Sequence, residues 1–213
     1  MDELLEGYRR FRRNEWPVYQ RDFAALARHG QAPHALIIAC SDSRVTPELI
    51  FSAIPGDLFV VRNIANLVPP YAPDAANHGT SAALEFAVRV LGVQRIVVVG
   101  HSGCGSVAAL MRGAPAEAQD FIGNWMRIAE PARLRAEAVF PNDIEAACNR
   151  CEIENIRVSL ENLRGFPWIE AARLAGNLKI MGMYFDVGAG RLYRVEDEGL
   201  VSLDETTDEP ALR

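Results

Sequence analysis

Two short segments of the chain carry side chains that bind metals and hold protons. They are residues 40–44, CSDSR, and residues 100–105, GHSGCG. Each begins at or just before the end of an apolar run, HALIIAC (34–40) or RIVVVGH (95–101), of a kind typical of a buried strand. Thiolate and imidazole are ligands that zinc prefers, and an Asp–Arg pair holds its carboxylate ionised. These two segments are therefore the candidate site.

Two readings of the second segment compete with a metal site. A nucleophile elbow needs G-x-S-x-G, but Cys104 occupies the fifth position. No histidine follows Ser102, so the hydrolase order Ser…Asp…His cannot be built. Residues 103–108 match a G-x-G-x-x-A dinucleotide fingerprint, which also requires a second strand that ends in an acid about 20 residues later. Residues 117–140 predict a helix there, which disfavours this reading.

A metal site uses the histidine and both cysteines. His101 and Cys104 are three residues apart at the exit of a strand, so both side chains can turn toward one ion. Cys40 ends a second predicted strand, and parallel neighbours bring their carboxyl ends to the same edge of a sheet. Two Cys and one His form a catalytic zinc pattern that leaves the fourth position for water. Spacing alone leaves a second interpretation open, in which the cysteines are ordinary small buried residues.

Continuous apolar strands alternate with helices along the chain, which predicts the fold. We expect an α/β protein with a mainly parallel central sheet flanked by helices, an antiparallel C-terminal hairpin and N-terminal helices. The predicted strands are residues 34–40, 57–63, 95–101, 178–187 and 191–196. The predicted helices are residues 2–29 (interrupted near Pro17), 76–92, one from Gly105, 117–140, 143–163 and 168–175. The expected parts are an N-terminal helical arm (1–33), a zinc-binding catalytic α/β domain (34–196) and an acidic tail (197–213).

Composition limits the class of protein. The chain has 213 residues, is 49% hydrophobic and has a net charge of −6. Residues 196–213 hold seven acids and one base, so the remainder is neutral and the excess charge belongs to the tail. An acidic balance argues against nucleic acid as a partner. No apolar run is long enough to span a bilayer and the N-terminus lacks an apolar signal region, so we expect a cytoplasmic protein without a membrane partner.

Three ordered motifs resemble those of the beta-class carbonic anhydrases. They are C-x-D-x-R at residues 40–44, FVVRNIAN at 59–66 and GHSGCG at 100–105, with weaker similarity at 159–163 and 182–186. The resemblance implies one Zn²⁺ per chain, held by Cys40, His101 and Cys104, with Asp42 and Arg44 as a pair beside the metal. It also implies a dimer as the basic unit, or a tetramer, with N-terminal helices that embrace the partner subunit.

The implied reaction is the reversible hydration of CO2 to bicarbonate and a proton by a zinc-bound hydroxide. Asp42 would accept a hydrogen bond from that hydroxide, and Arg44 would hold Asp42 ionised and away from the metal. Backbone N–H groups around Gly103 would bind the bicarbonate oxygens. Two thiolates cancel the charge of Zn²⁺, so the water should be less acidic than the zinc water of pKa about 7 in the familiar carbonic anhydrase example. We therefore expect activity that rises above neutral pH.

Two other functions remain open on these residues. One is a carbonyl sulfide or carbon disulfide hydrolase on the same fold, because the ligands do not separate these linear substrates from CO2. The other is a catalytically inactive zinc-binding regulatory protein, which the intact Asp42–Arg44 pair argues against.

Some members of the family have a regulatory bicarbonate pocket built from a Trp, an Arg and a Tyr. The corresponding positions here are Ile37, Arg62 and Phe185, so only the arginine remains. We therefore expect no bicarbonate inhibition of that type and a structural or interface role for Arg62.

Overall fold

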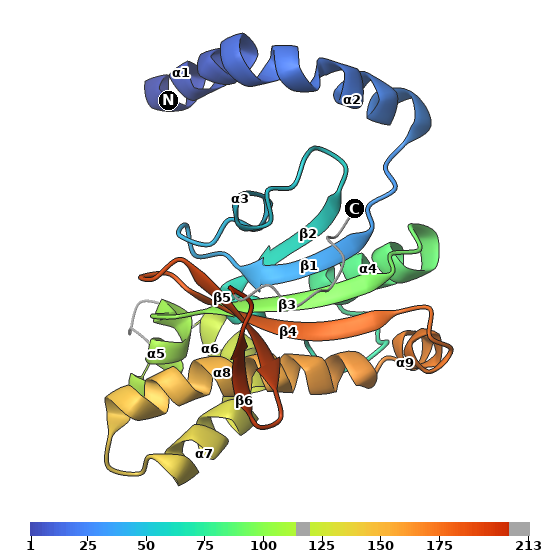
Figure 1. Cartoon of the computed structure of the whole chain (residues 1–213). Helices are drawn as coiled ribbons and strands as arrows, with labels where there is room; N and C mark the ends of the chain where they lie inside the picture. The colour runs from blue at the N-terminus through green and yellow to red at the C-terminus, as the bar shows by residue number, and fades with distance from the viewer. Residues whose placement is uncertain (114–119, 205–213) are drawn as a thin grey trace.

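The computed structural model describes residues 1–113 and 120–204, which form a six-stranded mixed sheet between helices (Figure 1). The strand order is β2-β1-β3-β4-β5-β6. The first four strands in that order are parallel, and β5 and β6 are antiparallel to their neighbours. This confirms the predicted fold class. The strands are β1 (Ala35–Cys40), β2 (Leu58–Asn63), β3 (Arg95–His101), β4 (Lys179–Asp186), β5 (Arg191–Glu196) and β6 (Gly199–Ser202).

The register of the parallel strands sets the position of the candidate site. All six residues of β1 are buried, as are the last six of β3, which explains why both runs are apolar on both faces. β1 pairs with β3 up to Ala39 opposite Val99, so the two strands end side by side. Cys40 and His101 therefore lie at the same carboxyl edge of the sheet.

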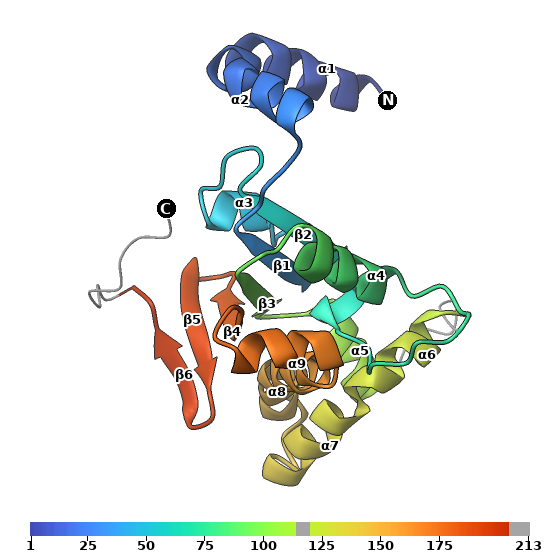
Figure 2. The same cartoon turned by 90° about the vertical axis from the view of Figure 1, so that its right-hand side faces the viewer.

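Helices cover one face of the sheet in a thick layer (Figure 2). The largest core cluster joins Leu36, Ile38 and Val98 of this face to residues of α4, α8 and α9. The Asp143 side chain caps α8 by accepting a hydrogen bond from the Ala146 N–H at 3.0 Å. The helices on this side are α4 (Gly79–Glu85, extended by a π-helical turn to Val90), α5 (Gly105–Arg112), α6 (Ile122–Met126), α7 (Glu130–Val139), α8 (Ile144–Arg164) and α9 (Pro167–Leu174).

The opposite face has a thinner cover. Ile37, Ala39 and Val97 form a second cluster there, against Phe51 and the short helix α3 (Pro47–Ile50). The alternating residues of β1 thus pack into two different cores, which is why the whole strand must be apolar.

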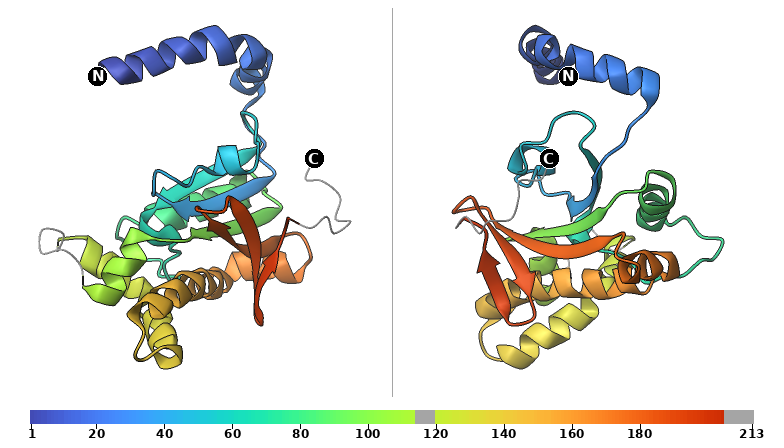
Figure 3. Two further views of the ribbon diagram at one scale, coloured as in Figure 1. Left: turned by 60° about the vertical axis from the view of Figure 1, so that its left-hand side comes forward. Right: turned by 45° about the vertical axis from the view of Figure 1, so that its right-hand side comes forward.

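The N-terminal segment is a helical arm that stands away from the sheet (Figures 1–3). It comprises α1 (Asp2–Arg10), a π-helical turn (Phe11–Glu15) and α2 (Trp16–His29). None of the residues in these three elements is buried. The predicted interruption near Pro17 falls where the π-helical turn ends and α2 begins, and this proline lies in the first turn of α2, where a missing N–H is tolerated.

Two sequence predictions are corrected by the structure. The helix predicted over residues 117–140 is described from residue 122 as α6, a 3₁₀ turn (Arg127–Ala129) and α7, and Pro131 begins the new helix at its first turn. Residues 117–119 of the predicted helix lie outside the part of the chain that the structure describes. Strand β6 was not predicted, because four residues in an acidic context give too short a pattern. It lies within the segment expected as an acidic tail, of which residues 205–213 are outside the description.

Among the residues that the structure describes, no helix combines the length and the hydropathy that a membrane crossing requires.

Candidate active site

Three side chains that favour metals meet at the carboxyl edge of the sheet. One ligand atom from each of Cys40, His101 and Cys104 lies within 4.8 Å of the other two. All three residues are at most 3% exposed. The chain thus brings together two sulfurs and one nitrogen from segments more than 60 residues apart.

The local backbone turns Cys104 back toward His101. Gly103 has φ +65°, a left-handed conformation that glycine adopts without strain, and α5 begins at Gly105. Gly100, just before His101, meets a different constraint. A Cβ atom there would lie 2.7 Å from the Cγ1 and Cδ1 atoms of Ile156, so α8 packs closer to this strand than another residue would allow.

The His101 ring is oriented so that one nitrogen is free for a ligand. Nδ1 lies 3.0 Å from the carbonyl oxygen of Ser102, and since a carbonyl only accepts, Nδ1 carries the proton. Nε2 is buried and has no hydrogen-bond partner among the described residues. An unpaired buried nitrogen is unfavourable, and a metal ion would satisfy it. This observation, together with the two sulfurs, fits a zinc ion.

The two thiols of the cluster have opposite pKa shifts. The hydrogen bond with Cys104 lowers the pKa of Cys40, and the same bond raises the pKa of Cys104, which burial raises further. Cys40 is therefore the more acidic of the two thiols. Burial lowers the pKa of His101, but Cys40, the Ser102 carbonyl and Asp42 together outweigh it and the net shift is upward. A site that concentrates negative charge in this way favours a soft divalent cation.

Asp42 and Arg44 form a two-point ion pair beside the cluster. Arg44 Nε and Nη2 donate to Asp42 Oδ1 and Oδ2 at 2.9 and 2.7 Å, and the Arg44 N–H donates to Oδ1 at 3.0 Å. Arg44 Nη2 also donates to the Gly103 carbonyl at 2.9 Å, which ties the two sequence motifs together. The hydrogen bonds from Arg44 hold the pKa of Asp42 well below its usual range. Asp42 Oδ2 lies 3.9 Å from His101 Nε2, so an ionised carboxylate faces the metal-ligating atoms.

Arg62 holds the backbone of the first motif. Its Nε and Nη2 donate to the carbonyl oxygens of Cys40 and Asp42 at 3.1 and 2.7 Å. Arg62 therefore has the structural role expected from the sequence. Ile37, at the position of the family's Trp, is 2% exposed within β1.

The structure adds Glu152, a residue that the sequence analysis did not identify. Its buried carboxylate accepts hydrogen bonds from the Cys104 N–H and from the Tyr184 hydroxyl, both at 2.9 Å. Burial raises the pKa of Glu152 above its usual value. A glutamate in the middle of a helix normally faces water, so its sequence position carries no signal of this role.

The amides expected to bind bicarbonate are partly occupied. The Ser102 N–H donates to the Phe185 carbonyl at 3.0 Å, and the Cys104 N–H donates to Glu152. The substrate-binding role expected for Gly103 stays a prediction, and the amide left to fill it is the Gly103 N–H.

Cys148 and Cys151 are buried in the same apolar cluster as Cys40 and Cys104.

The fold and the site define a class: an α/β protein with two thiols, an imidazole and an Asp–Arg pair at the carboxyl edge of a parallel sheet. Residues 35–192 match the model of the carbonic anhydrase family. The chain therefore belongs to this family, and its relatives place it in the beta class, as an enzyme.

Curated relatives support this placement. The chain is 40% identical over 192 residues to a carbonic anhydrase of Pseudomonas aeruginosa, covering 90% of this chain and 86% of that one. It is also 40% identical over 187 residues to the chloroplastic beta carbonic anhydrase 5 of Arabidopsis thaliana, covering 87% of this chain and 61% of that one.

Solved structures show the same fold. The beta-carbonic anhydrase CcaA matches with a TM-score of 0.88 at 33% identity, over 95% of this chain and 98% of that one. A tetrameric beta-carbonic anhydrase of Sordaria macrospora matches with a TM-score of 0.72 at 32% identity, over 91% and 92%.

Proposed function

We propose that this enzyme catalyses the reversible hydration of CO2 to bicarbonate and a proton with one zinc ion per chain. Cys40, His101 and Cys104 would hold the ion. The observation that carries the proposal is the convergence of these three ligand atoms within 4.8 Å, beside the paired carboxylate of Asp42. When bound, zinc would acidify a water molecule and so supply a nucleophile above neutral pH.

The residues of the chain orient this chemistry. Asp42 stays ionised because of Arg44, so it accepts a hydrogen bond from the attacking group and directs its lone pair at the carbon of CO2. The two contacts from Arg44, and its third to the Gly103 carbonyl, keep the carboxylate from occupying the open metal position. A neutral site, with Asp42 balanced by Arg44 and zinc by two thiolates, suits a neutral substrate.

Zinc content and CO2 hydration, measured on the same preparation, test the proposal. We expect one zinc per chain and hydration by stopped flow in the native protein. Cys104→Ser should lose both. Cys148→Ser, which changes a cysteine buried in the same apolar cluster, should keep both and is the matched control. One zinc per chain without CO2 hydration would contradict the proposal and favour a sulfur-substrate hydrolase or an inactive zinc-binding protein.

We also propose that the chain self-associates as a dimer or tetramer. The arm exposes Leu4, Leu5 and Tyr8 on α1 and Val18 on α2, and neighbouring exposed apolar side chains favour a protein contact. The tetrameric Sordaria enzymes are of the same fold. Sedimentation velocity should give at least a dimer, and Leu4→Glu with Tyr8→Glu should weaken it. A monomer at micromolar concentration would contradict self-association.

A further inference from the structure

The short turn that follows β2 has an unusual backbone conformation. It comprises Ile64–Asn66, and φ is +63° at Ala65 and +47° at Asn66. Both residues are buried, Ala65 completely. The left-handed conformation is unfavourable for alanine, and it persists only where the surroundings fix it, often at functional sites. Groups outside the turn must therefore hold this backbone.

Three successive carbonyl groups of the turn accept hydrogen bonds from side chains of two helices. Trp125 Nε1 on α6 donates to the first carbonyl, that of Ile64, at 2.8 Å. On α8, Asn155 Nδ2 donates to the second carbonyl at 2.6 Å, and Ser159 Oγ donates to the third at 3.2 Å. Each peptide group of the turn thus has its orientation fixed from outside.

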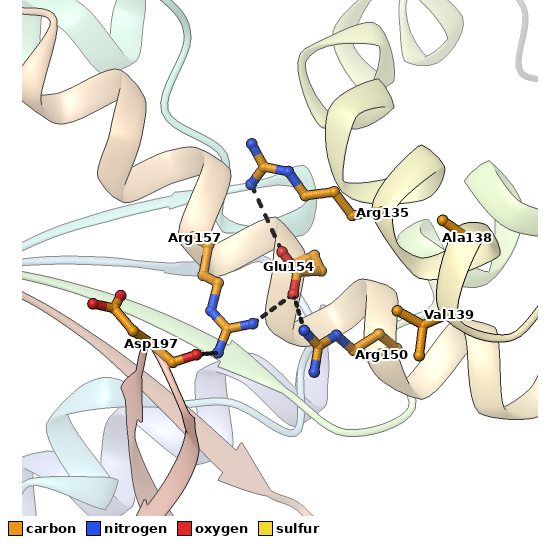
Figure 4. A pocket seen from close by; sticks show the side chains of 7 residues that line it. All are labelled: Arg135, Ala138, Val139, Arg150, Glu154, Arg157 and Asp197. Carbon is orange, nitrogen blue, oxygen red and sulfur yellow. Dashed lines mark hydrogen bonds and ion pairs between the residues drawn. The ribbon is translucent and has the colours of Figure 1, made fainter.

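The helix that carries two of these donors is itself tied to its neighbours (Figure 4). Glu154, next to Asn155, is 4% exposed, and its Oε1 lies 2.7 Å from Arg150 Nη2. The same oxygen lies 2.5 Å from Arg157 Nη1, and Oε2 lies 3.7 Å from Arg135 Nη1 on α7. Arg157 also donates to the carbonyl of the last residue of β5 at 2.6 Å. These contacts join α8 to α7 and to the sheet, so its side chains hold the turn from a fixed position.

The turn lies beside the first of the proposed zinc ligands. Cys40 pairs on the sheet with Asn63, the residue just before the turn, and shares an apolar cluster with Ala65. The Ala65 N–H donates a hydrogen bond to the Cys40 sulfur. The bond with Cys104 contributes most to the lowered pKa of Cys40, and the Ala65 N–H lowers it further. The buried turn therefore presents a backbone donor to a sulfur of the site.

One peptide group connects Trp125 to Cys40. It joins Ile64 to Ala65, and in a trans peptide the C=O and the N–H point in opposite directions. The bond from Trp125 to the carbonyl therefore directs the N–H on the other side toward the sulfur. Hydrogen bonds in such a chain also polarise one another, so the indole donor strengthens the N–H as a donor.

We propose that Trp125 is a positioning residue for Cys40, acting through the Ala65 N–H, with Asn155 and Ser159 as supports of the same turn. The inference rests on the proposed function only in taking Cys40 as a zinc ligand. A thiolate that accepts an N–H bond has a fixed position and donates less charge to its metal than a bare thiolate. The turn thus stabilises the ligand and leaves the metal a stronger Lewis acid.

The cobalt-substituted enzyme tests the proposal, because a thiolate-to-cobalt charge-transfer band moves to lower energy when the sulfur loses a hydrogen bond. Trp125→Phe keeps an aromatic ring and removes the N–H. We expect its band at lower energy and its zinc affinity, by chelator competition, lower by about tenfold or more. Trp168→Phe is the matched control, since Trp168 is also half-buried but packs against Phe166 in another cluster, and it should change neither. Asn155→Leu removes the donor to the second carbonyl and decides the matter if Trp125→Phe does not fold.

The cobalt band is the deciding measurement. An unchanged band in the folded variant would overturn the inference, even if urea unfolding showed a loss of stability, because the contact would then be structural only. The proposed function fails in a different way. If the native protein binds zinc but does not hydrate CO2, the band should still move in Trp125→Phe. A native protein that binds no zinc would contradict both.

Discussion

The buried carboxylate of Glu152 accepts a hydrogen bond from the backbone N–H of Cys104, 48 residues away in the sequence. This contact connects the middle of α8 to the turn that carries one of the proposed zinc ligands. The same carboxylate accepts from the Tyr184 hydroxyl on β4, so one side chain positions the ligand turn against the sheet.

Loss of this carboxylate should loosen the metal site. Glu152→Ala leaves two buried donors without a partner, at about 1–3 kcal/mol each, and should lower zinc affinity by about 10–100-fold. Glu152→Gln keeps an acceptor oxygen for Cys104 and should be milder. Zinc affinity by chelator competition and unfolding in urea measure both effects. Glu145→Ala, at a position 75% exposed near the start of the same helix, should change neither. Native zinc affinity in Glu152→Ala would contradict the positioning role.

The Asp42–Arg44 pair should control the chemical step. Asp42→Asn removes the proton acceptor, and Arg44→Ala frees Asp42 to approach the metal. We expect each to lower kcat/KM for CO2 hydration by about 10²-fold, within the range of acid–base effects. Arg89→Ala breaks an exposed pair with Glu85 of the same 2.7 Å length and serves as the control. Rates close to those of the native enzyme in both site variants would rule the pair out.

Activity should increase from pH 6 to pH 9. Two thiolates donate more charge to zinc than imidazoles do, so water held there should lose its proton above the pKa of about 7 known for a three-histidine site. Arg44 keeps the pKa of Asp42 well below its usual range. Asp42 is therefore ionised from pH 6 to pH 9, and its titration does not contribute to the change in rate. Stopped-flow rates across the range provide the measurement. A flat profile would disagree with the proposed ligand set.

Gly100 should accept a side chain only if α8 shifts away from β3. Gly100→Ala places a Cβ 2.7 Å from two atoms of Ile156 and should reduce the free energy of unfolding by about 1–3 kcal/mol. Ile156→Ala removes those atoms, so the double variant should be more stable than the sum of the single effects predicts. Gly105→Ala, where a Cβ meets nothing within 4 Å, is the control. Additive effects in urea unfolding would argue against this contact.

Bicarbonate should inhibit only by simple competition. Ile37 is buried at the position where some family members have a tryptophan, and Arg62 is already bonded to the Cys40 and Asp42 carbonyls. The remaining partner of that pocket is also missing, since Phe185 has no hydroxyl. Hyperbolic inhibition curves are expected from steady-state rates at increasing bicarbonate. Sigmoidal curves would show that a regulatory pocket exists after all.

The sequence alone predicted the parallel core and the group of candidate ligands. Apolar runs that end in Cys40 and His101 require buried strands, and parallel pairing then brings their ends together. Asp42 and Arg44 are two residues apart after one strand, so local geometry suffices to pair them. Such features depend on neighbours in the chain or on a repeated pattern, and both are visible in a sequence.

Only the tertiary structure revealed Glu152, the arginines around Glu154 and strand β6. Glu152 and the arginines around Glu154 depend on where α8 lies over the sheet, which is set by its close approach to Gly100 and Gly182 through Ile156. Strand β6 depends instead on its pairing with β5. The approach of α8 turns Glu152 toward Cys104, and the same helix carries Arg150 and Arg157, which meet Arg135 of α7 around Glu154. Contacts of this kind join residues tens of positions apart without a periodic pattern, so packing in three dimensions decides them.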